Sequence, residues 1–194
     1  MKNKELLKKL NNYINNYIID DVKSSNDLTK IHGTNAFAYG TTPYDTFKEI
    51  YDNITINIER FIVVGCSIGW MNFYFNELNP SIKTIGIDIH NTRLDYAKSL
   101  VKEYNLNNIS FTLESFEDFE FKDGDLIWES NLCFPNELNN KCNNNLINKV
   151  SDISIISYKD LRNVEKLNDF NHLKLELPVS WMDNQKFHIY EKTK

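Results

Sequence analysis

The sequence lacks several features that mark common classes of protein. Its three cysteines are an odd number without C-x-x-C spacing, so they indicate neither a disulfide framework nor a zinc site, and they favour reducing surroundings. It has no apolar run of about 18 residues or more, and its first residues lack the apolar centre of a signal peptide. We therefore expect a soluble, intracellular protein without a membrane partner, in either the nucleus or the cytoplasm.

The chain also lacks the positive charge that a nucleic-acid-binding surface requires. Its formal net charge is −5 at neutral pH, whereas affinity for nucleic acid comes mainly from phosphate neutralisation by lysine and arginine. We expect no strong binding to nucleic acid by the chain itself, and an acidic surface suits a basic protein partner. Nothing in the sequence indicates the oligomeric state.

Most of the chain alternates between buried strands and amphipathic helices. Phe61 to Val64 is an apolar, β-branched run stopped by Gly65, as in a parallel strand buried on both faces. Further strands are expected over 83–89, 109–113, 125–128 and 153–158, with helices over 70–78, 90–104 and 136–150. The alternation predicts a doubly wound α/β fold, with a Rossmann-like, mostly parallel sheet of seven strands.

The two ends of the chain depart from this alternation. Apolar residues from Leu6 to Ile18 recur at spacings of three and four, which predicts an amphipathic cap or lid helix before residue 20. Pro43 opens a second helical stretch, because proline suits the first helical turn. Residues 173–179 and 186–192 alternate in polarity, which predicts an antiparallel C-terminal hairpin joined by the stretch WMDNQ.

The length of the chain limits its domain organisation. A sequence of 194 residues can bury one full-sized core but has little left for another. We therefore expect an N-terminal helical cap over residues 1–34 and one domain over residues 35–194 that carries the site.

A ligand of a doubly wound sheet binds beyond the carboxyl ends of the strands, where the strand order reverses. The loop after the first strand contains Gly65 and Gly69, which let the backbone approach a ligand. Asp88 ends the second strand, where an acidic side chain can accept both hydroxyls of a ribose. Ser115 and Phe116 follow the third strand and are candidates to contact adenine, although a loop serine and a core phenylalanine fit equally well.

These positions form a nucleoside site, which a nicotinamide dinucleotide or S-adenosyl-L-methionine can use. A dinucleotide requires the tighter G-x-G-x-x-G loop for its pyrophosphate, and that pattern is missing. The antiparallel hairpin also favours the arrangement found in methyltransferases. S-adenosylmethionine is therefore the expected cofactor, and no metal site is expected.

Five blocks of the sequence follow the order of one known family. They are YGTTPYDTFKEI at 39–50, FIVVGCSIG at 61–69, GID at 86–88, ESNLCF at 129–134 and PVSW at 178–181. Together they resemble the signature of the Dot (disruptor of telomeric silencing) lysine methyltransferases over about residues 35–192. The resemblance implies a class I methyltransferase, without a SET fold, that methylates a lysine on a core histone, free or within the nucleosome.

The resemblance also implies roles for individual residues. The implied cofactor-binding residues are Tyr39, Gly40, Thr41, Thr42, Gly65, Cys66, Ser67, Gly69, Asp88, Ser115, Phe116 and Asn131. The implied catalytic residues on the substrate side are Tyr39, Asn131, Phe134 and Trp181.

Methyl transfer is an in-line displacement from a sulfonium, so a protein supplies alignment and excludes water. A lysine nucleophile must arrive neutral, and a channel walled by Tyr39, Phe134 and Trp181 disfavours the ammonium by desolvation. The same rings can hold a methylated cation, and Asn131 can orient the amine with its side-chain carbonyl. No general base is required if the proton leaves by water. The four histidines are scattered and are expected at the surface or in loops: His32, His90, His172 and His188.

Several positions depart from the pattern of the Dot family. Val63 and Val64 stand where the first strand usually ends in an acidic residue. Ser67 replaces a glycine, which is tolerable only at negative φ or in a relaxed loop. Three further replacements remove a glutamate, an aspartate and an asparagine: Thr41, Ser115 and Ser130.

Three interpretations stay open from the sequence. The first is a minimal Dot-like lysine methyltransferase that acts on a histone. The second is the same fold acting on another protein or on a small molecule, since fold does not determine the target. The third is a non-catalytic binding module whose altered loop no longer holds the cofactor.

Overall fold

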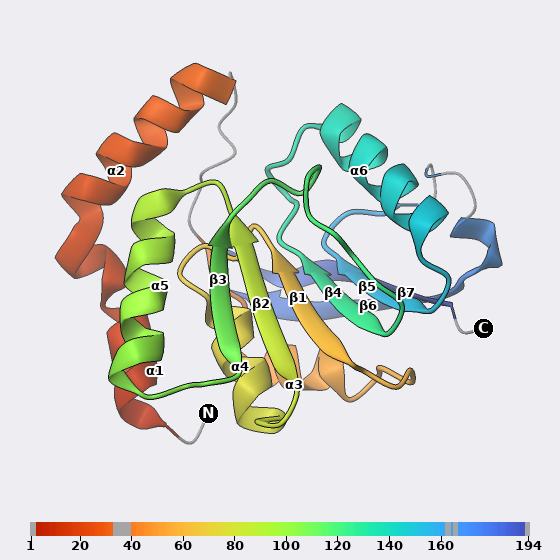
Figure 1. Ribbon diagram of the computed structural model, residues 1–194, viewed down its shortest axis with the longest axis horizontal. Coiled ribbons are helices and arrows are strands. Elements are labelled where there is room, and N and C mark those ends of the chain that lie inside the picture. Colours follow the sequence, from red (N-terminus) through yellow and green to blue (C-terminus); the bar gives the residue numbers. More distant parts are fainter. Residues whose placement is uncertain (1–2, 33–39, 162–163, 165–166, 193–194) are drawn as a thin grey trace.

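Short runs of apolar, β-branched residues form one mixed sheet, with strand order β3-β2-β1-β4-β5-β7-β6 (Figure 1). The computed structural model describes residues 3–32, 40–161, 164 and 167–192. The strands are β1 (Arg60–Val64), β2 (Lys83–Asp88), β3 (Ile109–Leu113), β4 (Asp125–Glu129), β5 (Ile153–Ser157), β6 (Asn171–Val179) and β7 (Met182–Lys192). β1 to β5 are parallel, and β7 runs antiparallel to both β5 and β6.

Helices cover both faces of this sheet and enclose two apolar cores. The helices are α1 (Lys4–Asn11), α2 (Tyr13–His32), α3 (Tyr44–Tyr51), α4 (Trp70–Leu78), α5 (Asn91–Glu103) and α6 (Asn136–Lys149), with a short 3₁₀ turn, η1 (Leu167–Asp169). One core contains residues of α1, α3, α4 and α5, and the other contains residues of α6 and of the segment that follows β5. The predicted doubly wound fold with its seven strands is thereby confirmed.

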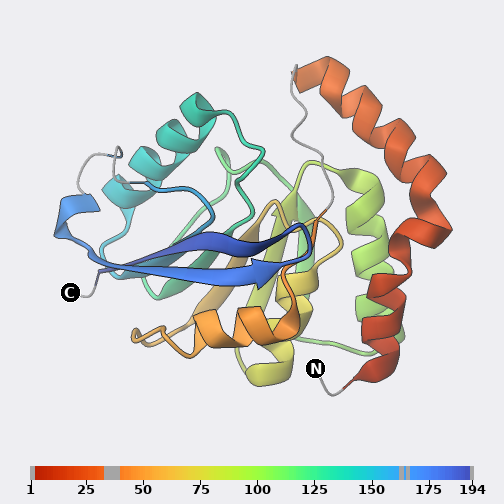
Figure 2. The same cartoon turned by 180° about the vertical axis from the view of Figure 1, so that it is seen from behind.

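The C-terminal hairpin is present, but its turn is shorter than predicted. The register pairs Val179 with Met182 and Leu177 with Gln185, so most of the stretch WMDNQ belongs to β7. The register shifts between Leu177 and Val179, around Pro178, which has no amide hydrogen for the ladder. Figure 2 shows this hairpin at the front of the opposite side of the molecule. Only Ser180 and Trp181 form the turn, which directs Trp181 away from the sheet edge.

The N-terminal cap consists of two helices and extends beyond the single helix predicted before residue 20. A break at Asn12 separates α1 from α2, and α2 continues to His32, outside α5 (Figures 1 and 2). None of the helices in the described ranges is long and apolar enough to span a membrane. The boundary between a cap at 1–34 and a domain at 35–194 stays a prediction.

A buried ion pair attaches α2 to α5. The Arg93 guanidinium donates from Nε and Nη2 to the two carboxylate oxygens of Asp21 at 2.7 and 2.8 Å, and the Tyr13 hydroxyl donates to the same carboxylate at 2.9 Å. Burial raises the pKa of Asp21, but Arg93 outweighs it and the pKa lies below its usual value. Such a pair is stable only because its hydrogen bonds are made.

One of the four histidines, His188, contradicts the expectation of a surface or loop position, and His90 lies in the loop before α5 as expected but is buried. His90 is fully buried where α2 covers the start of α5, with its Nε2 3.0 Å from Ser25 Oγ. Burial lowers the pKa of His90, which favours its neutral form. His188 is buried within β7 and lies 3.1 Å from His172. The side chain of His32 falls outside the described part of the structure.

Candidate functional site

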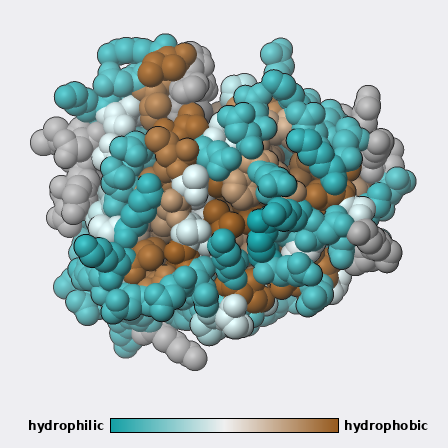
Figure 3. Space-filling view, viewed as in Figure 1, coloured by the Kyte–Doolittle hydropathy of each residue, from teal (hydrophilic) through white to brown (hydrophobic). Residues whose placement is uncertain are grey.

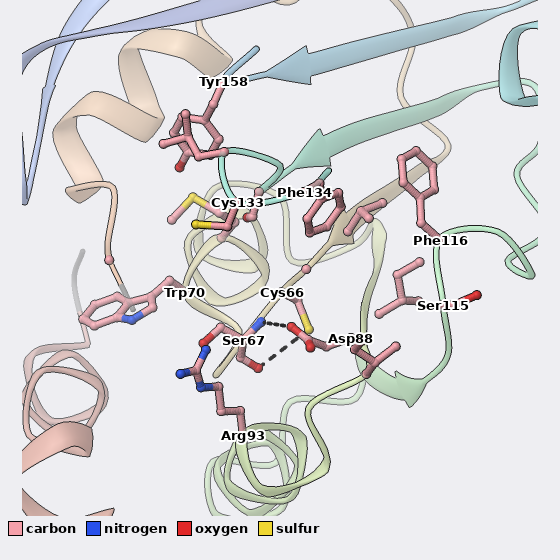
Figure 4. Close-up of a pocket in the computed structure, with 18 of the residues that line it drawn as sticks. Cys66, Ser67, Trp70, Asp88, Arg93, Ser115, Phe116, Cys133, Phe134 and Tyr158 are labelled. Carbon is pink, nitrogen blue, oxygen red and sulfur yellow. Dashed lines mark hydrogen bonds between the residues drawn. The ribbon is translucent and has the colours of Figure 1, made fainter. Parts of the chain in front are cut away.

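A pocket opens where the strand order reverses, at the carboxyl ends of β1, β2, β4 and β5 (Figure 4). Its volume is about 630 Å³, within the range of cofactor and substrate sites. Asp88, the last residue of β2, lies at one side of the pocket, and Tyr158, directly after β5, lies at the other. Phe134 and Cys133 lie between them. The strands therefore arrange the lining residues in a row from a polar end to an aromatic end.

The loop between β1 and α4 turns sharply and forms the floor of the pocket. Gly65, Ser67 and Gly69 all have positive φ, at 67°, 52° and 87°. A serine at position 67 was expected to have a negative φ or to lie in a relaxed loop, but its φ is positive. In this left-handed conformation a serine is less favourable than a glycine by about 1 kcal/mol. The conformation is held by a hydrogen bond of 2.7 Å from the Ser67 amide to Asp88 Oδ2.

Asp88 is oriented by two backbone amides. Besides Ser67, the amide of His90 donates to Asp88 Oδ1 at 2.9 Å. A carboxylate has about four lone-pair sites, so two hydrogen bonds leave acceptor capacity for the hydroxyls of a ribose. Asp88 lines the pocket, and the structure thus gives it the geometry that the ribose-binding hypothesis requires.

The β3 side of the pocket brings together the two residues expected to contact adenine. Ser115 and Phe116 both line the pocket, and Phe116 also packs edge-on against Phe121 at 5.6 Å between ring centroids. The Ser115 hydroxyl donates to Asp118 Oδ2 at 2.7 Å. Its side chain therefore orders the local turn, while the ring of Phe116 offers an apolar surface to a planar base.

The opposite end of the pocket is apolar and aromatic. Its lining residues are Trp70, Leu132, Cys133, Phe134, Tyr158 and Trp181. The rings of Tyr158 and Trp181 lie 6.0 Å apart, and Trp181 is 43% exposed, so this end communicates with solvent. Of these residues, only Phe134 and Trp181 were predicted from the sequence.

Two distant segments meet at this end and enclose it. The Thr41 amide donates to Ser180 Oγ at 3.0 Å, and the Ser180 amide donates to the Thr41 carbonyl at 3.0 Å. Gly40 lies directly against the ring of Trp181. Residues 40–42 and the turn at Ser180 and Trp181, far apart in the sequence, are thus brought together, and Gly40, Thr41 and Thr42 all line the pocket. Tyr39, expected in both the cofactor and the catalytic set, lies outside the described residues.

Asn131 does not lie where the sequence interpretation places it. Its side chain is fully buried and does not line the pocket, and the two hydrogens of its Nδ2 are shared among Glu129 Oε2, Asn139 Oδ1 and Ser157 Oγ, each 2.8 Å away. Two residues after Glu129, it points to the same side, toward α6, because side chains alternate along an extended chain. The pocket is lined by the neighbouring Ser130 instead. Gly69, another predicted cofactor-binding residue, does not line the pocket either and forms the N-cap of α4.

The cluster around Asn131 contains a carboxyl group with unusual protonation. Glu129, at the end of β4, is fully buried and accepts from Asn131 and Asn143 at Oε2, at 2.8 and 3.3 Å. Burial raises the pKa of Glu129 to about 8. Among the described residues, Glu129 Oε1 and the side-chain oxygens of Asn131 and Asn143 have no hydrogen-bond partner. A proton on Glu129 adds a donor to this group of acceptors, so the neutral acid is favoured at neutral pH.

Gly69→Ala should destabilise the protein by about 3 kcal/mol, because the residue has a positive φ and its Cβ would lie 2.4 Å from Cζ of Phe111. Urea unfolding measures the effect. Gly124→Ala is the matched control: its φ is 82°, but its Cβ would meet only the flexible side chain of Glu59, so about 1 kcal/mol is expected. Equal losses in the two variants would show that the contact with Phe111 is not restrictive.

Comparisons with known proteins agree with this geometry. A family model described as a methyltransferase domain matches residues 59–192. No curated protein has a sequence that matches the chain. Among solved structures, magnesium protoporphyrin IX methyltransferase from Synechocystis PCC 6803, with bound SAM, is similar at 12% identity, covering 93% of this chain and 94% of that one, with a TM-score of 0.60.

Two further structures are similar over smaller shares. TrmK from M. capricolum, in complex with S-adenosyl-homocysteine, is 18% identical over 76% of this chain and 67% of that one, with a TM-score of 0.55. PKMT2 from Rickettsia typhi is 18% identical over 54% of this chain, with a TM-score of 0.47, and this chain spans only 21% of its length. At these identities the likeness shows the fold alone.

Proposed function

Since the chain belongs to the methyltransferase domain family and is an S-adenosylmethionine-dependent methyltransferase, we propose that its substrate is a lysine of a basic protein, in the manner of the Dot enzymes. The observation that carries the proposal is the aromatic end of the pocket, which is open to solvent beside Trp181. A core histone is the proposed target.

The residues present fit the cofactor. Asp88 offers carboxylate oxygens to a ribose, and Phe116 offers a ring to an adenine. The positive φ angles of Gly65 and Gly69 bring the loop backbone close to the pocket, and Val64 makes its floor apolar. When bound, S-adenosylmethionine supplies an electrophilic methyl group on a sulfonium.

The aromatic end is suited to a neutral amine. Phe134, Tyr158 and Trp181 wall it. Among the described residues, the acidic side chains that line the pocket lie at the other end, at the end of β2 and after β3: Asp88, Glu114 and Glu117. An ammonium loses hydration in such surroundings, which lowers the pKa of an entering lysine and favours its nucleophilic form. After transfer, the same aromatic faces stabilise a methylated cation.

The surface around the pocket suits a protein rather than a fully enclosed small molecule. Leu132 and Trp181, on two different segments, line the pocket and are 39% and 43% exposed. Figure 3 shows apolar side chains, in brown, exposed between the parts of this face formed by α5 and by α6 in Figure 1. The net charge of −5 favours the approach of a basic partner.

The substrate is tested by incubating the protein with radiolabelled S-adenosylmethionine and, separately, histone octamers, nucleosomes and an extract of small metabolites. Label on a histone lysine, located by mass spectrometry, supports the proposal. Label found only in small molecules would contradict the histone target and identify the substrate class. The Asp88→Ala protein, which should not hold the cofactor, serves as the blank.

Trp181→Ala should lower the rate of protein methylation by about ten-fold, because one aromatic wall of the open end is removed. Its affinity for S-adenosylhomocysteine, measured by calorimetry, should stay unchanged. Met182→Ala is the matched control, since Met182 is equally exposed, at 47%, but does not line the pocket. Equal rates for the two variants would remove Trp181 from the substrate side.

A further inference from the structure

Two hydroxyl groups face each other at the aromatic end of the pocket, and the sequence analysis assigns no function to the two of them together. Tyr158 Oη lies 2.5 Å from Thr42 Oγ1, and both residues line the pocket. We propose that this pair, the hydroxyl pair, positions the amine that accepts the methyl group. This inference rests on the proposed function in one respect, the choice of an amine as acceptor.

The place of the hydroxyl pair in the sheet assigns it to the acceptor. Along the sheet, β2, β1, β4 and β5 are consecutive neighbours, and adjacent strands lie about 4.8 Å apart. Asp88 ends β2 and Tyr158 follows β5, so three spacings, about 14 Å, separate these two ends of the pocket. The ribose-binding group is therefore remote from the hydroxyl pair, whereas the exposed Trp181 is its neighbour.

The count of hydrogens defines what the pair can bind. Two hydroxyls carry two hydrogens, and the bond between them uses one. The Trp128 indole N–H interacts with one lone pair of Tyr158 Oη, and the other hydrogen and the remaining lone pairs are left for other partners. A neutral primary amine must keep its lone pair directed at the methyl group, so it is held through its N–H groups, for which the hydroxyl oxygens are acceptors.

Tyr158 is a positioning residue rather than a base. Burial raises the pKa of Tyr158 to about 12, so its phenol stays protonated at neutral pH. It orients the amine but does not remove its proton, which leaves by water, as in a reaction without a general base.

The ring of Tyr158 is fixed by its neighbours. It lies 5.0 Å from the ring of Phe187 and 5.9 Å, edge-on, from that of Trp128, and both of these residues are fully buried. Thr42 is buried as well, at the start of the segment that leads into α3. A donor or acceptor held in this way contributes to binding without first losing much conformational freedom.

A pair of ligands tests the proposal without a substrate. Sinefungin carries a primary amine in place of the transferable methyl group of S-adenosylmethionine, whereas S-adenosylhomocysteine carries nothing there. Calorimetry with the full chain should show that Tyr158→Phe binds sinefungin about 5-fold more weakly and leaves the affinity for S-adenosylhomocysteine within about 2-fold. Thr42→Val should weaken sinefungin selectively in the same way.

Ser115→Ala is the control, because it removes a pocket hydroxyl from the opposite end and should change both affinities alike. Thermal unfolding of each variant checks that the fold is intact, and Thr42→Val decides the matter if Tyr158→Phe does not fold. Equal loss of the two ligands in both hydroxyl variants, or no selective loss of sinefungin, overturns the proposal. Selective loss together with unlabelled histones would refute the histone target and leave the hydroxyl pair supported.

Discussion

Asp88→Ala should weaken the binding of S-adenosylmethionine by roughly 100-fold or more. Asp88 is the one carboxylate at the end of β2, and hydrogen bonds from two ribose hydroxyls to a charged group contribute about 1.5–3 kcal/mol each. The variant also removes the acceptor of the Ser67 and His90 amides, so the loop after β1 loses one of its attachments to β2 and keeps those of the Gly65 and Cys66 amides to the Ile87 carbonyl. Calorimetric titration of the purified variant and the parent protein measures the effect.

Glu114→Ala separates a specific role of Asp88 from a general effect of charge. Glu114 also lines the pocket and is acidic, but it follows β3 rather than β2. The affinity for S-adenosylmethionine should change by no more than about 3-fold in this variant. If Glu114→Ala and Asp88→Ala lose affinity equally, the assignment of Asp88 to the ribose is wrong.

Glu129→Gln should remove a pH dependence from the stability of the protein. The folded state raises the pKa of Glu129 from an ordinary value of 4.5 to about 8, so the folded protein binds this proton more tightly than the unfolded chain. The stabilisation is fully present below pH 4.5 and is lost as the pH rises toward 8. Within that window each pH unit costs about 1.4 kcal/mol.

Urea unfolding of the parent protein and the Glu129→Gln variant between pH 6 and pH 8 measures the difference. The parent should lose roughly 3 kcal/mol more than the variant over this range. Glutamine has the shape of the neutral acid and both a donor and an acceptor, so it preserves the bonds to Asn131 and Asn143. The same dependence on pH in both proteins would mean that Glu129 is already ionised at pH 6.

The fold and the cofactor end of the pocket could be predicted because their signals are local. Continuous apolar runs define β1 and β2, and the residues after them, Gly65 and Asp88, are placed at the sheet edge by the fold itself. The meeting of residues 40–42 with the turn at Ser180 required the family resemblance, since no local pattern relates segments so far apart.

The errors arise where long-range packing decides. Asn131 was assigned to the pocket because it follows a strand, but the alternation of side chains directs it toward α6 and leaves Ser130 at the pocket. The loop position of His90 is as predicted, but its burial arises because α2 crosses the start of α5, which periodicity within α2 could not reveal. Tyr158 was treated only as the end of a strand. Its position at the carboxyl end of β5, one strand beyond β4 at the switch point, was the available signal.

We expect the pocket at the ends of β2, β1, β4 and β5 to hold S-adenosylmethionine with its methyl group directed toward Tyr158 and Trp181. A crystal structure of the protein with S-adenosylhomocysteine tests this binding mode. The ribose hydroxyls should lie on Asp88 and the adenine beside Phe116, with an open space toward Trp181. Density for the ligand elsewhere, or in the reverse orientation with its adenosine beside Tyr158, would contradict it.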